Sequence, residues 1–353
     1  MTDRKEPTLS FDVTEFGGGV VDVISAAGDI VSDVVSGIPA PVKKSLIKAL
    51  SQLCTAAVDV PIAHFEGLAA EKRAEYKSRV TLINESAKQI SAQLNVDERF
   101  VHAASHKFAK KVVREQVNLN SVAAVAVAEL KDGKHTISQD NPQAESVSEP
   151  PLIGDDWLNA FEQEAATKSS AEMQQLFGKI LAGEIRKPCS FSIKTLRLIS
   201  QLDSAAAQAF AKFCSIAVSK VVDGSTFDVR VVSPGVDRTM NPLREFGLPY
   251  SSLLLLQESG LLLTELESSM DYSSSILEAG KHSHPFRYLN KDNFFMLSGD
   301  TQYSGRLQLV GPALTTSGRE LFSIVDLVPN HFYTSSLHGY LHIKGLRMMS
   351  MNS

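Results

Sequence analysis

The stretch "AEMQQLFGKILAGEIRKPCSFS", residues 171–192, limits the possible folds of this chain more than any other segment. Its large apolar residues recur three and four positions apart, which predicts a helix with one buried face. They are Met173, Leu176, Phe177, Ile180, Leu181 and Ile185. At about 100° per residue, Glu184 falls near the middle of the same face. A carboxylate buried among apolar side chains must be paired, hydrogen-bonded or neutral, so it serves either as a catalytic acid or as a structural group.

The neighbouring residues favour a structural role for Glu184. Three kinds of group lie near it in the sequence: Arg186, Arg197 on the next predicted helix, and the backbone amides that open that helix at Ser192. A carboxylate that accepts such amides would fix the corner "RKPCSFS". A general acid or base would need a second titratable partner and a cleft, and the sequence shows no obvious partner. We therefore interpret Glu184, Arg197 and Ser192 as a structural pin, meaning a carboxylate that holds the backbone, and we predict no catalytic residue.

The composition indicates an ordinary globular protein. Its 353 residues suffice for two or three domains, with 43% hydrophobic and 21% charged residues. A net charge of −5 provides no global basic field for nucleic acid, so any such surface would be local. The three scattered cysteines indicate reduced thiols. Residues 1–15 lack the pattern of a secretory signal, and no apolar run of about 18 residues predicts a spanning helix. We expect a cytoplasmic protein, with a peripheral place at the inner membrane left open.

Residues 1–60 form a leader rich in small side chains. A predicted amphipathic helix has an acidic strip and a broad apolar face, which includes Val20, Ile24, Ile30, Val31 and Val34. Pro41 then opens a second helix that runs to about Leu53. This face suits either packing within a fold or oligomer, or insertion at a membrane surface. Because membrane-binding helices usually carry Lys and Arg on the polar face, the acidic strip favours packing against protein.

Residues 61–130 are predicted to form long charged helices, partly like a coiled coil, with breaks near Asn95 and between about 117 and 122. Within them lies a basic strip, which consists of Lys107, Lys110, Lys111 and Arg114. The strip suits either phosphate contact or a solvated helix face. The composition of residues 131–153 then changes to Gly, Pro, Ser, Asn and Gln, which predicts a flexible linker and the main domain boundary.

The second half is predicted to hold two further modules. Four short-looped helices over residues 154–222 indicate a four-helix bundle, with caps at Asp155 or Asp156, Ser169, Ser192, and Asp203 or Ser204. In residues 223–353 the pattern alternates between strands and helices, which predicts a small α+β module that is winged-helix-like. The expected fold class is therefore mainly α, with long N-terminal helices, a central bundle and this C-terminal module.

Three separated segments resemble a known bacterial family. They are similar to the family catalogued as domain of unknown function 2806. The three segments are Trp157 to Phe210, residues 58–80 and the tail "LTTSGRELF". Cys189 departs from the family pattern, in which a Gly is more usual after the proline. The first segment is also more distantly similar to the alpha-type abortive-infection proteins of phage defence. The resemblance implies a bacterial cytoplasmic protein without assigned catalysis, in which antiviral defence is a plausible setting.

Candidate metal and nucleophile positions are incomplete. His102 and His106 are four apart on a predicted helix, but they lack a third ligand and lie beside the basic strip. Five of the nine histidines occur in the last module, where His338 and His342 are predicted to lie on one strand. No G-x-S-x-G or phosphate-loop motif is present. We predict no metal and no cofactor.

These features predict a non-enzymatic interaction or assembly protein, a sensor or effector in phage defence, whose partners are other proteins or copies of itself. Two alternatives stay open: membrane perturbation by residues 16–53, and nucleic-acid binding by the 107–114 strip or the C-terminal module. An enzyme whose site is assembled only by the fold also stays open.

Overall fold

The computed structural model divides the chain into two compact units, Met1–Ser190 and Phe191–Ser353. It describes residues 40–54, 98–132, 152–222, 225–234, 241–278, 283–289, 293–300, 303 and 305–351. Three predictions concern segments outside these residues. They are the apolar face from Val20 to Val34, the coiled-coil-like helix of residues 61–97 and most of the linker. Within them the chain is mostly helical with a small antiparallel sheet, as the sequence predicts.

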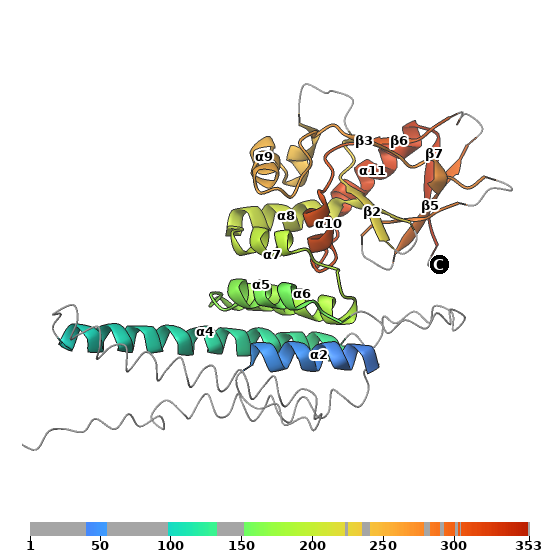
Figure 1. Cartoon of the computed structure of the whole chain (residues 1–353). Helices are drawn as coiled ribbons and strands as arrows, with labels where there is room; N and C mark the ends of the chain where they lie inside the picture. Colours follow the sequence, from blue (N-terminus) through green and yellow to red (C-terminus); the bar gives the residue numbers. More distant parts are fainter. Residues whose placement is uncertain are drawn as a thin grey trace, which may run out of the picture. The chain divides into compact units, whose positions relative to one another are not determined.

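Four helices make up the described part of the first unit (Figure 1). They are α2 (Ala40–Leu53), α4 (Glu98–Asp132), α5 (Asp155–Ala165) and α6 (Ala171–Arg186). Most of the apolar face predicted for residues 171–185 is buried, whereas Met173 and Leu176 are half-buried. Phe177 packs against Phe161 with ring centroids 5.6 Å apart. Phe161 in turn stacks on Trp157. The core of this unit therefore contains the stripe from which the sequence argument began.

Helices α4 and α6 approach unusually closely at Gly178. A Cβ built at this position would lie 2.4 Å from Cγ1 of Val125, which is closer than real Cβ atoms come to other atoms. Side-chain hydrogen bonds join Gln174 to Asn118 near the start of α6, and Arg186 to the carbonyl of Glu129 near its end. The two helices therefore run in the same direction, with their C-terminal ends at the same end of the unit.

The second unit combines five helices with strands. The helices are α7 (Ile193–Ser200), α8 (Ser204–Ile216), α9 (Tyr250–Glu258), α10 (Thr316–Phe322) and α11 (His331–Ile343). The strands are β1 (Val218–Val222), β2 (Ser225–Arg230), β3 (Ser269–Asp271), β4 (Phe286–Arg287), β5 (Phe294–Gly299), β6 (Gln308–Val310) and β7 (Leu346–Ser350). An antiparallel sheet has the order β2-β1-β4-β5-β7, and β3 pairs separately with β6.

The division between the units falls inside residues 154–222, which the sequence argument assigned to one four-helix bundle. Helices α5 and α6 belong to the first unit with α2 and α4, whereas α7 and α8 belong to the second unit. The corner after α6, which contains Pro188, separates the two pairs. The helix predicted to continue past Ile216 instead gives way to β1, because Ala217 already has an extended backbone.

Candidate functional site

Glu184 is buried at the end of α6, and its carboxylate holds the corner that follows. Its two oxygens accept hydrogen bonds from the backbone amides of Cys189, at 2.6 Å, and Ser190, at 3.0 Å. Cys189 takes a left-handed backbone conformation with a φ of 67°. Glycine adopts this conformation more readily than any other residue. Two charge-assisted hydrogen bonds to a strained corner are what a structural role requires of this carboxylate.

The partners of Glu184 differ from those predicted. The amide of Ser192 donates to Glu320 of α10, at 2.8 Å, and the Ser192 side chain caps α7 by accepting from the amide of Thr195. Arg197 is exposed on α7 in the second unit. The amides that reach Glu184 are therefore two and three residues earlier than the expected one, because the chain turns at Cys189 before α7 begins.

The basic strip lies on the N-terminal half of α4. The side chains of Lys107, Lys110, Lys111 and Arg114 are all exposed. Lys111 pairs with Glu115 one turn further on, at 3.7 Å. Large apolar side chains are exposed beside the strip, with Phe108 46% and Val113 49% accessible. This half of the helix is therefore both charged and apolar at its surface.

A groove of about 1220 Å³ lies in the second unit. Helix α9 contributes Tyr250, Leu253, Leu254 and Gln257 to one side, and the end of α11 contributes Tyr340, Ile343 and Lys344. The remaining lining comes from residues 264–267, from Gln308, Val310 and Pro312, and from the two segments around Pro234 and Pro242. The groove is thus assembled from parts of the chain that are more than a hundred residues apart.

Apolar groups in this groove face solvent to an unusual degree. Tyr250 is 57% exposed and Ile343 is 82% exposed, although both are large hydrophobic side chains. Leu253 lies below them, buried in the unit. Lys344 extends over the ring of Tyr340, with 5.0 Å between its Nζ and the ring centroid. The groove therefore combines exposed apolar side chains with polar groups at its rim.

The acidic character of the groove comes from one segment. Residues 241–278 supply α9 and the wall at 264–267, and they carry one basic residue, Arg244. Their acidic residues are Glu245, Glu258, Glu265, Glu267, Asp271 and Glu278. Glu265 and Glu267 line the groove and are exposed. The groove therefore presents apolar side chains beside a wall of negative charge.

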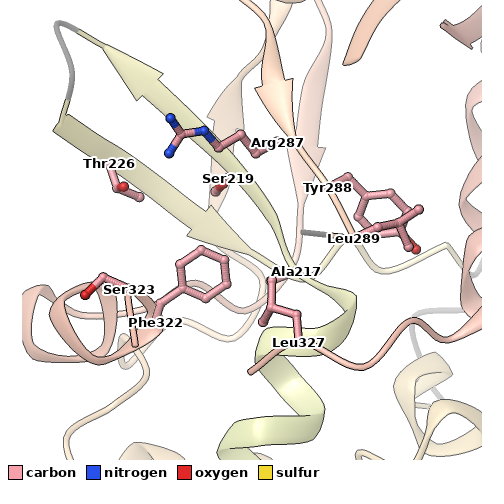
Figure 2. Close-up of a pocket in the computed structure, with 9 residues that line it drawn as sticks. All are labelled: Ala217, Ser219, Thr226, Arg287, Tyr288, Leu289, Phe322, Ser323 and Leu327. Carbon is pink, nitrogen blue, oxygen red and sulfur yellow. The ribbon is translucent and has the colours of Figure 1, made fainter. Parts of the chain in front are cut away.

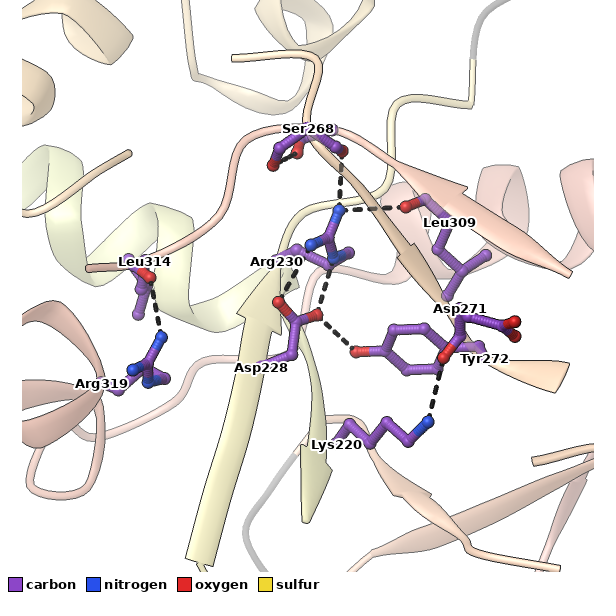
Figure 3. Close-up of polar contacts among 10 residues, drawn as sticks. Lys220, Asp228, Arg230, Ser268, Asp271, Tyr272, Leu309, Leu314 and Arg319 are labelled. Carbon is purple, nitrogen blue, oxygen red and sulfur yellow. Dashed lines mark hydrogen bonds and ion pairs between the residues drawn. The ribbon is translucent and has the colours of Figure 1, made fainter. Parts of the chain in front are cut away.

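A buried polar network lies behind the groove (Figure 3). The guanidinium of Arg230 donates to both oxygens of Asp228, from Nε at 2.6 Å and from Nη2 at 3.0 Å. Its Nη1 donates to the carbonyls of Ser268, at 2.7 Å, and Leu309, at 3.0 Å. Ser268 follows the groove residue Glu267, and Leu309 lies within β6. Arg230 therefore ties β2 to both segments that form this side of the groove.

The third member of the network is Tyr272, whose hydroxyl donates to Asp228 at 2.9 Å. Burial raises the pKa of the Tyr272 phenol well above its usual 10.0, and the adjacent Asp228 carboxylate raises it further. The phenol therefore stays protonated and remains a donor. Because Arg230, Asp228 and Tyr272 are all buried, the network acts on the position of the groove wall.

A second, much smaller hollow of about 80 Å³ lies among β1, β2, β4 and α10 (Figure 2). Ser219, Thr226 and Arg287 line it together with apolar side chains from α10 and the following segment. The guanidinium of Arg287 also stacks on Phe294, 4.9 Å from the ring centroid. Because ligand sites usually enclose about 300 Å³ or more, this hollow is better regarded as a packing gap.

The histidine predictions are only partly open to comparison with the structure. The side chains of His102 and His106, and all of His282, lie outside the described residues. His338 and His342 lie one turn apart on α11, so the prediction that they share a strand is wrong. No group of three or more His, Cys, Asp or Glu side chains among the described residues is placed to hold a metal. Nor is any of the described helices long and apolar enough to cross a bilayer.

Sequence reasoning missed both the groove and the buried network. A signal for the network was present in "TFDVRVV", because Asp228 and Arg230 are two apart on a strand and so lie on the same face. No local pattern could have revealed the groove, since its walls meet only in the folded chain.

The described residues define a protein of two units, mostly helical, whose second unit has a groove with apolar and acidic lining. The sequence pattern of the family described as "Protein of unknown function (DUF2806)" matches residues 102–338, and the chain belongs to this family. The match begins in α4 and ends in α11, which confirms the resemblance that the sequence predicted. No curated protein and no solved structure matches the chain.

Proposed function

We propose that this protein is a non-enzymatic interaction module that binds a segment of a protein partner in the groove of its second unit. One observation carries the proposal: the groove gathers large apolar side chains, Tyr250 and Ile343 above all, that remain exposed to solvent. At about 1220 Å³ the groove exceeds the range of about 300–1,000 Å³ that is typical of small-molecule sites. Its size and shape suit an amphipathic helix, whose apolar face would cover these side chains.

The Arg230 network supports this proposal because a binding surface gains affinity when it is rigid before the partner arrives. Arg230 fixes Ser268 and Leu309, and the amide of Gly311 donates to the carbonyl of Ser268 at 3.0 Å. The wall at 264–267 is therefore attached at its C-terminal end to the pair of strands β3 and β6.

Selection of a random displayed peptide library against the full-length protein tests the proposal. We expect enriched peptides that carry apolar residues at helical spacing together with Lys or Arg. Their binding should fall at least about tenfold in Ile343→Arg, which removes an exposed anchor and adds repulsive charge. Phe227→Arg is the matched control, because Phe227 is 55% exposed on β2 of the same unit and does not line the groove. Peptides that bind both variants equally would contradict the proposal.

Nucleic-acid binding by the basic strip is a second candidate, and the exposure of its four cations supports it. Each phosphate contact would make binding weaken steeply with salt. The test is the affinity of the double variant Lys110→Glu with Lys111→Glu for RNA and DNA oligonucleotides. An affinity equal to that of the wild type would exclude this candidate function.

Three further parts of the hypothesis are proposals that rest on the sequence. Membrane perturbation by residues 16–53 is tested by liposome flotation with and without that segment. A contribution of residues 1–60 to assembly is tested by light scattering of the shortened chain. A role in phage defence, which rests on the weaker family resemblance, is tested by phage plating on cells that express the wild-type chain or Ile343→Arg.

We also propose that the second unit is winged-helix-like. Three features support this description. Gly260, with a φ of 71°, follows the C-cap of α9; Leu262 bridges Leu314; and the antiparallel pair β3–β6 lies between these two leucines in sequence. An experimental structure of the unit compared with winged-helix proteins is the test.

A further inference from the structure

We infer that the occupant of the groove is the N-terminal half of α4, residues 103–117, from a second copy of this chain. The inference rests on the proposed function and names the partner. It makes the protein a head-to-tail assembly, in which each copy offers a basic amphipathic helix and receives another in its groove.

The residues of α4 are arranged as a helix-binding groove would require. At about 100° per residue, the four cations Lys107, Lys110, Lys111 and Arg114 fall within an arc of about 100°. Phe108 and Val113 lie outside this arc, about 60° beyond its two edges, and both are exposed. Val117 is also exposed but lies about 20° from Lys110, at the edge of the basic arc. A helix with this division is typical of segments that dock into a groove or on a surface.

The exposed half of α4 also lies far from the place where the chain leaves the first unit. Because α4 and α6 run in the same direction, the end of α6 lies beside Glu129. Phe108 precedes Glu129 by 21 positions, which is about 30 Å along the helix at 1.5 Å per residue. In Figure 1 this half of α4 extends beyond α2, α5 and α6, the other described helices of the unit. The helix is therefore presented outward, where another copy can reach it.

The groove offers the complementary chemistry. Tyr250 and Ile343 provide exposed apolar surface for Phe108 and Val113. The acidic segment 241–278, with Glu265 and Glu267 at the groove itself, faces an occupant whose polar side is basic. Charge complementarity of this kind speeds association and fixes the orientation of the helix. It also predicts an assembly that weakens as salt increases.

The contact joins two different surfaces, so it is heterologous. Such contacts produce rings if the rotation between copies closes and open chains if it does not. Each copy keeps one unused helix and one unused groove until the assembly closes. A variant that lacks one of the two surfaces can therefore still use the other.

Light scattering of the full-length protein over a range of concentrations, at low and high salt, tests the inference. We expect the mass to rise with concentration and to fall with salt. Two variants each remove one of the surfaces: the double variant Lys110→Glu with Lys111→Glu removes the helix surface, and Ile343→Arg removes the groove surface. Each variant should raise the concentration needed for assembly at least about tenfold. The matched controls are Lys194→Glu with Lys212→Glu, two exposed lysines of the second unit, and Phe227→Arg. Both controls should assemble as the wild type does.

An equimolar mixture of the two defective variants gives the decisive result. One intact helix and one intact groove remain, so the mixture should form pairs and go no further, although each variant alone stays monomeric. A wild-type chain that is monomeric at every concentration overturns the inference, as does a mixture that stays monomeric. Binding of liposomes or oligonucleotides by the helix, unaffected by Ile343→Arg, also overturns it. If library peptides still require Ile343 in a strictly monomeric chain, the inference fails while the proposed function stands.

Discussion

Removal of the Asp228 carboxylate should strongly destabilise the second unit. In Asp228→Ala the guanidinium of Arg230 stays buried, with carbonyl partners but no counter-charge. Breaking one side of a buried ion pair costs about 3–5 kcal/mol, a large part of the roughly 5–15 kcal/mol that holds a domain together. With a urea dependence of about 2 kcal/mol per molar, the unfolding midpoint should fall by about 2 M.

The two units can be followed separately in this experiment. The only tryptophan, Trp157, lies in α5 of the first unit, so its fluorescence reports that unit. Six of the seven tyrosines lie in residues 191–353, so tyrosine near-ultraviolet circular dichroism reports mainly the second unit. We expect the tyrosine transition to move and the Trp157 transition to stay in place. The matched control is Glu245→Ala, which removes an exposed carboxylate of the same unit.

A double-mutant cycle separates an uncompensated charge from a general loss of packing. Asp228→Leu with Arg230→Met replaces the pair by apolar side chains and should recover most of the lost stability, because well-packed apolar replacements of buried pairs are often neutral. The reasoning is refuted if Asp228→Ala is no more destabilising than Glu245→Ala. It is also refuted if the double variant is as unstable as the sum of the two single changes.

Three further predictions concern other parts of the chain. Gly178→Val should lower the unfolding free energy of the first unit by about 2–3 kcal/mol, because no room exists beside Val125. Tryptophan fluorescence measures this change, and the added substitution Val125→Ala should restore part of the lost stability. The free energy of unfolding should fall as pH rises above about 10, because the unfolded chain releases the Tyr272 proton at its ordinary pKa while the folded chain, in which this pKa is raised, retains it. In urea titrations at alkaline pH, Tyr272→Phe should make the free energy of unfolding depend less steeply on pH. An unchanged dependence on pH would contradict this. In maleimide labelling of the native protein, the exposed Cys189 should react first and Cys54 slowly, since burial raises the pKa of the Cys54 thiol to about 12. Equal labelling rates would count against the burial of Cys54.

Local signals in the sequence predicted much of the helical part of the fold. The side chains of Ser192 and Asp203 cap α7 and α8 as expected, and α2 ends at Leu53 as expected. The cap of α6 is Ser170, one residue after the predicted Ser169, because either of two adjacent serines satisfies the same pattern. Caps and apolar spacing are local properties, so they can be seen without knowledge of the fold.

Where the prediction was wrong, tertiary contacts overrode local preference. The polar run around Asn118 suggested a break between two helices, yet α4 is continuous. Asn118 is buried and its side chain donates to the carbonyl of Ala166 at 2.8 Å, so a bond to the end of α5 stabilises a weak helix former. Similarly, "HGYLHI" alternates like a strand but forms the end of α11, which Asn330 caps.

The candidate site could be predicted least. Glu184 stood out because a carboxylate interrupted an apolar stripe, but the amides that it binds depend on the turn at Cys189. The groove joins residues from Ser233 to Lys344, and only the folded unit brings Tyr250 near Ile343. A local pattern reports which residues are apolar, whereas a concave surface depends on how distant elements meet.

The central claim is that the groove binds a basic amphipathic helix, and fluorescence anisotropy tests it directly. A labelled synthetic peptide of residues 103–117 is titrated with the full-length variant Lys110→Glu with Lys111→Glu, whose own helix should not compete for the groove. The account predicts saturable binding that weakens with salt, is lost when Ile343→Arg is added and is retained when Phe227→Arg is added. Absence of binding, or equal binding to all three proteins, would contradict the account.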